Sequence, residues 1–337
     1  MVSTVGNRII APAFGTTLPA LEALSKTATR LPEGVIKRPP NYIRADSGRR
    51  IAEASALTRA PTDAELKPDR PARKKTEIQM QVGNDGRITG TPLDLTSKLL
   101  VKNQGVFIGE KHSDSMARDF LRTNMSSLKS QGVKAVFLEC IEKNNQGLIN
   151  AFYDAKTPAN EQKALARLES ALEATWGHDP KGYVDLIQSA KTNGVRVFGI
   201  DERKGPFSGR VPEDNTREST WRNQFWARTT NEVMSKQFNN RDKFVLLGGN
   251  AHAAGKLSYA TVLEGGGQKS VPSYGADYAL QIPSIRFNSS QDTKLPPGSY
   301  PTNRTPFSLA EVDYYVIGGG RESKGMMKPS GGATPSK

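Results

Sequence analysis

Short apolar runs alternate with amphipathic stretches through the middle of the chain. Residues 106–110 form an apolar run that ends on a carboxylate, and residues 113–130 repeat apolar side chains at helical spacing. Short apolar runs are typical of buried strands, and a repeat of about 3.6 residues is typical of helices. The strands that this pattern predicts are 106–110, 134–140, 195–201 and 243–248. The helices that it predicts are 113–130, 180–193 and 216–238, with a mainly helical stretch up to residue 175.

Strands that alternate with helices in this way predict a parallel sheet with helices on both faces. We therefore expect an α/β fold whose sheet is mainly parallel. Shorter patterns predict further elements at both ends of this region. They are a hairpin at 78–89 around Gly83-Asn84-Asp85-Gly86, helices at 94–101 and 253–259, and strands at 278–282 and 312–317.

Residues 1–76 show no sustained period and are rich in Pro, Ala, Ser, Thr and Arg. This composition is typical of a disordered leader. No acidic residue precedes Glu22, and the start contains several Ser and Thr residues. Such a start is similar to the secretion leaders of bacterial type III substrates, although a solvated tail has the same composition. The predicted organisation is thus a leader at 1–76 that could carry a translocation signal, an α/β domain at 77–318 and a flexible tail at 319–337.

Composition narrows the classes of partner. The net charge of +13 favours acidic partners such as nucleic acid. The basic residues are spread out and form no platform interleaved with aromatic residues, so we attribute the charge to the leader and expect no nucleic-acid partner. No window approaches the roughly 18 apolar residues of a membrane span, so we expect no stable membrane insertion. The start also lacks the apolar core of a secretory signal peptide.

Two strands of the predicted sheet lead into the same motif. The strand at 106–110 ends in Gly109-Glu110-Lys111-His112, and the strand at 243–248 is followed by Gly249-Asn250-Ala251-His252. The two Gly-x-x-His motifs hold two of the three histidines in the chain. Because ligands bind at the carboxyl edge of parallel sheets, we expect both histidines to face one site. The glycines would permit a sharp turn and a close approach that a Cβ would obstruct.

Other polar side chains fall at the same predicted edge. Glu139 ends the second strand, Asp201 ends the third, and Arg203 follows it. Arg222, with Arg228 as the alternate, lies on the helix before the His252 strand and could clamp a carboxylate or an oxyanion. The candidate catalytic residues are Glu110, His112, Glu139, Arg222 and His252, with Asp201 as an additional candidate.

This set of side chains supports two kinds of chemistry. His112, His252 and Glu139 could hold a divalent metal that activates water. Without a metal, a His or Glu could take a proton from water while Arg222 stabilises the oxyanion. Structural roles compete with both, because Glu110 could cap the next helix, and Glu139 could form a buried ion pair. His178 is expected to cap a helix or lie on the surface, and Ser113 and Cys140 lack the context of a nucleophile.

The ordered motifs resemble a known superfamily. It joins the erythromycin esterases, the Tiki and TraB proteases, the ChaN haem-uptake lipoproteins and a domain of the Pasteurella multocida toxin. The matching segments are 107–112, 137–139, 183–187, 194–201, 222–227 and 249–252, within residues 100–260. The resemblance implies a hydrolase-like site built from Glu110, His112, Glu139, Arg222 and His252. Members of the superfamily cleave lactones or peptides, some of them with a divalent metal, and others bind haem.

Departures from the superfamily decide which branch we expect. The chain shows no lipoprotein signal, which argues against haem uptake, and no membrane span, which argues against the Tiki and TraB branches. A core behind a disordered leader is similar to plant-pathogen effectors of the superfamily, which enter host cells and trigger cell death. We therefore expect a secreted virulence effector that hydrolyses an ester, amide or related bond on an unknown host target. The alternatives are a haem-like ligand-binding protein and nucleic-acid binding through the basic charge.

Overall fold

The computed structural model of the chain defines the α/β region and only one turn of the preceding segment. The structure describes residues 62, 64–67, 78, 80–203, 206, 212–253, 256–262, 268–289, 296–301 and 313–318. The predicted tail at 319–337 lies outside these residues, as does the predicted leader at 1–76 apart from 62 and 64–67. The domain boundaries therefore stay predictions.

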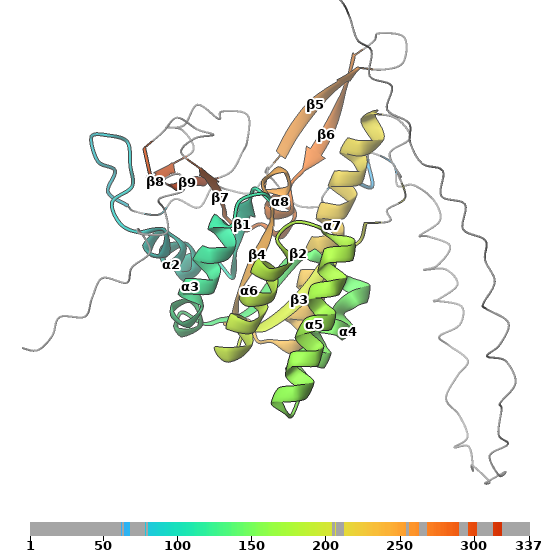
Figure 1. Cartoon of the computed structure of the whole chain (residues 1–337). Helices are drawn as coiled ribbons and strands as arrows, with labels where there is room; N and C mark the ends of the chain where they lie inside the picture. The colour runs from blue at the N-terminus through green and yellow to red at the C-terminus, as the bar shows by residue number, and fades with distance from the viewer. Residues whose placement is uncertain are drawn as a thin grey trace, which may run out of the picture. The chain divides into compact units, whose positions relative to one another are not determined.

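A seven-stranded sheet in the order β3-β2-β4-β1-β7-β9-β8 forms the centre of the fold (Figure 1). Every neighbouring pair is parallel except β8 and β9, so the predicted fold class is confirmed. The strands are β1 (Gly105–Glu110), β2 (Val133–Glu142), β3 (Arg196–Asp201), β4 (Lys243–Gly249), β7 (Ser284–Ser289), β8 (Gly298–Pro301) and β9 (Tyr314–Gly318).

Helices cover both faces of this sheet. Val106 and Ile108 pack with the helices α2 to α6 in one apolar cluster, whereas Phe107 packs with α7 and α8 in another. Because side chains alternate along a strand, the six-residue strand β1 contributes to both clusters and is buried throughout. The helices are α2 (Pro92–Lys102), α3 (Met116–Ser130), α4 (Gln146–Asp154), α5 (Pro158–Thr175), α6 (Pro180–Thr192), α7 (Pro212–Gln237) and α8 (Ala276–Leu280). None of the described helices is both long and apolar enough to cross a membrane.

The register between β1 and β4 brings the two Gly-x-x-His motifs together. Gly109 pairs with Gly248, and Glu110 pairs with Gly249. The chain therefore leaves both strands at the same edge, and β4 continues into a short 3-10 turn at Asn250–His252. The predicted convergence of the strand ends is confirmed.

Two of the shorter predictions were wrong. The helix predicted at 253–259 is not observed, because Lys256–Val262 forms the strand β5, paired antiparallel with β6 (Gln268–Tyr274). The strand predicted at 278–282 overlaps the helix α8, and the parallel strand β7 begins after it at Ser284. Alanine and leucine favour a helix in the first segment, whereas Ile285 and Phe287 alternate with polar residues in the second. The strand predicted at 312–317 is confirmed as β9.

The predicted hairpin is confirmed only as a tight turn. Val82 and Ile88 form an isolated antiparallel bridge, and no extended pair of strands follows in the described residues. Gly86 adopts a positive φ of 79°, a conformation that favours glycine. Further upstream, Leu66 is buried against Trp221 of α7, so this turn of the predicted leader contacts the α/β core.

Phe107 offers a direct test of the central strand. Its side chain is fully buried in β1, so Phe107→Ala should lower the free energy of unfolding by about 3–5 kcal/mol. Val101 in α2 is 80% exposed, and the control Val101→Ala should change stability by less than about 0.5 kcal/mol. Urea unfolding followed by circular dichroism measures both values. Equal effects of the two substitutions would contradict this assignment of the core.

Candidate functional site

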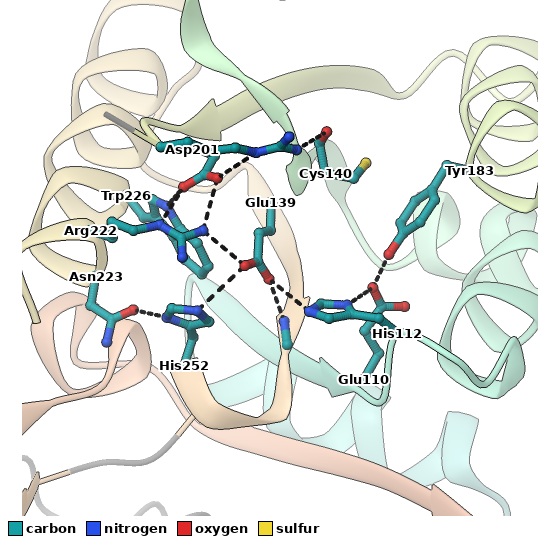
Figure 2. Close-up of polar contacts among 12 residues, drawn as sticks. Glu110, His112, Glu139, Cys140, Tyr183, Asp201, Arg222, Asn223, Trp226 and His252 are labelled. Atoms are coloured by element: carbon teal, nitrogen blue, oxygen red, sulfur yellow. Dashed lines mark hydrogen bonds and ion pairs between the residues drawn. The ribbon is translucent and has the colours of Figure 1, made fainter. Parts of the chain in front are cut away.

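Glu139 lies at the centre of the polar site at the sheet edge (Figure 2). The Nε2 atoms of His112 and His252 lie 3.8 and 3.4 Å from its two carboxylate oxygens. Arg222 Nη2 donates to Oε1 at 3.0 Å, and the backbone N–H of Gly249 donates to Oε2 at 2.6 Å. A carboxylate with only 4% of its side chain exposed needs donors such as Arg222 and the Gly249 N–H to offset the cost of its burial. The structure thus brings four of the five predicted catalytic residues into direct contact.

Glu110, the fifth predicted residue, contacts His112 from the other side. Its Oε1 lies 3.2 Å from His112 Nδ1. The buried Arg118 of α3 donates to Oε2 at 2.6 Å, and the hydroxyl of Tyr183 on α6 donates to Oε1. Three donors therefore occupy the Glu110 carboxylate, which is 2% exposed. Glu110 is placed to orient His112 rather than to cap the helix α3.

The two carboxylates approach His112 from opposite faces of the sheet. Glu110 is held by the helices α3 and α6, and Glu139 is held by Arg222 of α7. Since α3 and α7 cover different faces, His112 lies across the sheet edge with one ring nitrogen directed to each carboxylate. Its side chain remains 29% exposed, so solvent reaches part of the ring.

His252 is held in one orientation by an amide. Its Nδ1 lies 2.6 Å from Asn223 Oδ1, while Asn223 Nδ2 donates to the backbone oxygen of Tyr274 at 2.8 Å. That second bond fixes which end of the amide faces the ring, so the proton between ring and amide belongs to Nδ1. In the neutral imidazole, Nε2 is then an acceptor directed toward Glu139. The Trp226 ring, 4.4 Å away between centroids, packs beside it.

Asp201 fixes Arg222 in the site. Arg222 donates to the two Asp201 oxygens through Nε at 2.9 Å and Nη2 at 2.8 Å, and Trp226 Nε1 donates to the same carboxylate at 2.9 Å. A bidentate pair of this kind sets both the position and the plane of a guanidinium. Arg222 Nη1 has no hydrogen-bond partner among the described residues. The structure brings Arg222, and not the exposed alternate Arg228, to Glu139.

Burial and charge move the pKa values of the two histidines in opposite directions. Burial lowers the pKa of His112, but the hydrogen bond to Glu110 and the charges of Glu139 and Glu110 outweigh this effect and raise it. Burial dominates at His252 and lowers its pKa, although the charge of Glu139 acts the other way. Near neutral pH, His112 therefore gains a proton more readily than His252.

The motif glycines act through close approach rather than through unusual backbone angles. Gly249 has φ −58° and ψ 144°, which any residue can adopt. A Cβ on Gly249 would lie 2.7 Å from His112 Nε2, and a Cβ on Gly109 would lie 2.6 Å from Asn250 Oδ1. The predicted close approach is confirmed, whereas the turn at Gly249 uses no conformation that is reserved for glycine.

Several site residues were missed from the sequence. Arg118 was recognisable, because it continues the apolar face of α3 at helical spacing with Leu121 and Met125. Asn223 and Trp226 lie on α7 within the segment 222–227 that resembles the superfamily, but neither was predicted as a site residue. His178 is exposed, as predicted, but its ring stacks on that of His112 with centroids 5.8 Å apart.

The remaining predictions concern nucleophiles and metal. Cys140 is buried, and burial raises the pKa of its thiol well above the usual value, which agrees with its exclusion as a nucleophile. Arg203 lies 3.4 Å from Asp201 and donates to the backbone oxygen of Cys140.

Within the described part of the chain, no group of three or more His, Cys, Asp or Glu side chains is arranged to hold a metal ion. The metal set His112, His252 and Glu139 stays a prediction.

The opposite pKa shifts can be measured residue by residue. In an NMR titration of the ring C–H signals, His112 should titrate above about pH 6.5 and His252 below it. The stabilising contribution of His112 should be full below about pH 6.5 and lost as pH rises through its folded pKa. That of His252 should be full above about pH 6.5 and lost as pH falls toward its folded pKa. Single His→Gln variants assign the signals, and a His252 that titrates above His112 would contradict the electrostatic description.

Gly249→Ala tests the close approach to His112. The added Cβ would force the imidazole to move, so the His112 ring signals should shift and its raised pKa should return toward about 6.5. Gly147 in α4 has open space around its Cβ position, and the control Gly147→Ala should leave the His112 signals unchanged. Unchanged His112 signals in the Gly249 variant would show that the contact does not exist in solution.

Comparisons with known proteins agree with the motif pattern. Residues 97–205 match the family model described as haem-binding uptake, Tiki superfamily, ChaN. No curated protein matches the chain. The chain is similar to the type III effector HopBA1, with 19% identity, a TM-score of 0.46 and coverage of 68% of this chain and 94% of that one.

Two further structures are similar over comparable lengths. ChaN of Campylobacter jejuni, solved with cofacial haem, has 16% identity and a TM-score of 0.42, with 66% of this chain and 90% of that one covered. RRSP, a MARTX toxin effector domain from Vibrio vulnificus CMCP6, has 21% identity and a TM-score of 0.44. The match covers 59% of this chain but only 36% of the toxin structure. The predicted resemblance to the Tiki superfamily is thus confirmed by the family match over residues 97–205.

Proposed function

We propose that the site hydrolyses an ester, amide or related bond, with water as the nucleophile and His112 as the general base. The observation that carries this proposal is the convergence of two imidazole Nε2 atoms on the Glu139 carboxylate, at 3.8 and 3.4 Å. Each ring has its Nδ1 held by an acceptor, so each Nε2 is left to exchange a proton. Two Nε2 atoms that can accept a proton, close to a guanidinium, are suited to activate a water molecule next to a polarised carbonyl.

His112 is the better base of the two histidines. It is 29% exposed, whereas the His252 side chain is 10% exposed. Glu110 behind Nδ1 fixes the tautomer and stabilises the imidazolium that forms, as the carboxylate does in a catalytic triad. His252 and Glu139 would then position the attacking water, because both face the same space as His112 Nε2.

Arg222 would stabilise the negative charge that develops on the substrate oxygen. Its Nε and Nη2 are committed to Asp201 and Glu139, which leaves Nη1 to donate to the substrate. A donor fixed before the reaction costs no reorganisation when the charge forms. Asp201 is therefore proposed as the residue that positions Arg222 and not as a participant in proton transfer.

The proposed reaction has two steps. Water attacks the carbonyl carbon while His112 Nε2 accepts the proton of the water, and the carbonyl oxygen becomes an oxyanion beside Arg222. The oxyanion then collapses, the bond to the leaving group breaks, and the His112 imidazolium returns its proton to the leaving group. Water is the nucleophile because Cys140, beside Glu139 in the sequence, is buried and its thiol pKa is raised.

A divalent metal remains an alternative activator of the same water. His112, His252 and Glu139 are suitable ligands for zinc by residue type. Against this, Arg222 and the Gly249 N–H already donate to the Glu139 oxygens, and the arginine charge would repel a cation. We therefore assign no step to a metal. Metal content and titration of the full chain, with His112→Ala and His252→Ala, would detect a metal site directly.

The hydrolase proposal predicts different effects for two arginines of one helix. On a panel of aryl esters and amides, His112→Ala should lower kcat/KM at least about 100-fold. Arg222→Lys should also lower it about 100-fold, because lysine cannot replace the fixed guanidinium. The matched control Arg228→Lys should retain wild-type activity. Folding of each variant is checked by circular dichroism, and full activity in the folded His112 variant would exclude this mechanism.

The family match favours haem binding as a second candidate. The model that matches residues 97–205 describes haem-binding uptake, and imidazole is a common ligand of haem iron. Both ring nitrogens of His112 and His252 face carboxylate or amide oxygens, so the exposed His178 is the residue that fits an axial role. A Soret shift on haem titration that is lost in His178→Ala would support this candidate.

We further propose that the protein is a virulence effector that a bacterial secretion system delivers into a host cell. The support is the Ser- and Thr-containing start, without an acidic residue before Glu22. Fusion of residues 1–76 to a reporter, in bacteria with and without a functional type III system, tests delivery. Expression of wild type and His112→Ala inside host cells tests whether the site provokes cell death.

A further inference from the structure

The loop between α5 and α6 places two more rings against His112. The Trp176 ring meets the His112 ring edge-on, with centroids 4.6 Å apart and planes at 80°. The His178 ring stacks on the His112 ring at 5.8 Å and 21°. The third histidine of the chain therefore joins the other two at the site, although its sequence position predicted only a cap or a surface role.

Two arginines hold this loop at its ends. At the first end, the Arg203 guanidinium lies 5.0 Å from the centroid of the Trp176 ring, and its Nη1 donates to the backbone oxygen of Thr175. Because Arg203 also lies 3.4 Å from Asp201, this end of the loop is tied to the group that fixes Arg222.

At the second end, Arg118 pairs with Asp179 at 3.1 Å. Asp179 has a positive φ of 43°, and its side chain caps α6 by accepting from the Gly182 N–H. A non-glycine residue in this conformation is unfavourable unless the surroundings hold it there. Arg118 also donates to Glu110, so one buried guanidinium holds both the loop and the carboxylate that contacts His112 Nδ1.

Packing against the core accounts for the position of the Trp176 ring only in part. His178 is exposed, and Trp176 is only partly buried. The indole Nε1 of Trp176 is buried without a hydrogen-bond partner among the described residues. Native structures rarely leave a buried donor unpaired, and such groups ask for an explanation beyond stability.

We propose that Trp176 and His178 form a substrate-contacting wall that selects a planar aromatic group next to the scissile bond. This inference rests on the proposed function and specifies its substrate class. The His178 ring stacks on His112 and meets the Trp176 ring at 82°, but the residue as a whole is exposed, so an incoming ring can lie against its open side. Stacked and edge contacts with such residues contribute more binding free energy for an aromatic ring than for an aliphatic group of similar area. Trp176 and His178 thereby set which bond lies beside His112 Nε2.

Binding of two matched amides to the full chain tests the wall without turnover. The probes are N-acetyl-phenylalaninamide and N-acetyl-leucinamide, titrated while the Trp176 indole N–H signal is followed by NMR. The aromatic amide should bind about 3- to 10-fold more tightly. His178→Ala should abolish this preference, and His178→Phe, which restores a ring, should recover it. The control is Lys181→Ala, at a 72% exposed side chain in the first turn of α6.

The outcomes separate this inference from the hydrolase proposal. A preference that depends on the ring at position 178 supports the wall even if no ester or amide is hydrolysed. Equal binding of both amides, no binding of either, or a preference that survives in His178→Ala would overturn it. Those results leave the hydrolase test untouched, because that test uses His112→Ala and Arg222→Lys.

Discussion

The carboxylate of Glu139 is the feature on which the rest of the site depends. A buried negative charge is tolerated only when donors or positive charges surround it. The backbone of β4 and a guanidinium from α7 supply those donors, and two imidazoles from separate strand ends converge on the same carboxylate. The parallel sheet, the long helix α7 and the two glycine-containing turns each position one of these groups next to Glu139.

Access distinguishes the two histidines that face this carboxylate. His112 lies between carboxylates that come from opposite faces of the sheet, and its ring remains partly exposed. His252 is enclosed by Asn223 and Trp226. The charge of Glu139 therefore acts on one imidazole that is accessible to a substrate, His112, and on one that is enclosed, His252. This division gives a physical basis for one base and one positioning group.

The sequence was sufficient for the parts of the site that follow from strand geometry. Apolar runs that meet polar residues placed Glu110, Glu139 and Asp201 at one edge, because parallel strands share their direction. The predicted end of the second strand at Glu139 was wrong, because β2 continues to Glu142. The residues that pack around these side chains could not be predicted in this way. Asn223 and His178 reach the site through helix packing and a loop, and neither contact leaves a periodic signal. The wrong assignment at 278–282 has a similar origin, since a five-residue helix and a short strand look alike in sequence.

We propose that both imidazoles carry their proton on Nδ1 and direct an unprotonated Nε2 at the Glu139 carboxylate. Long-range ¹H–¹⁵N NMR of the imidazole nitrogens, recorded above the pH at which His112 titrates, measures the tautomer of each ring. The Nδ1–H form is expected for both His112 and His252. An Nε2–H form at His112 would leave Nε2 without a lone pair to accept a proton from water, and would contradict the proposed role of the residue.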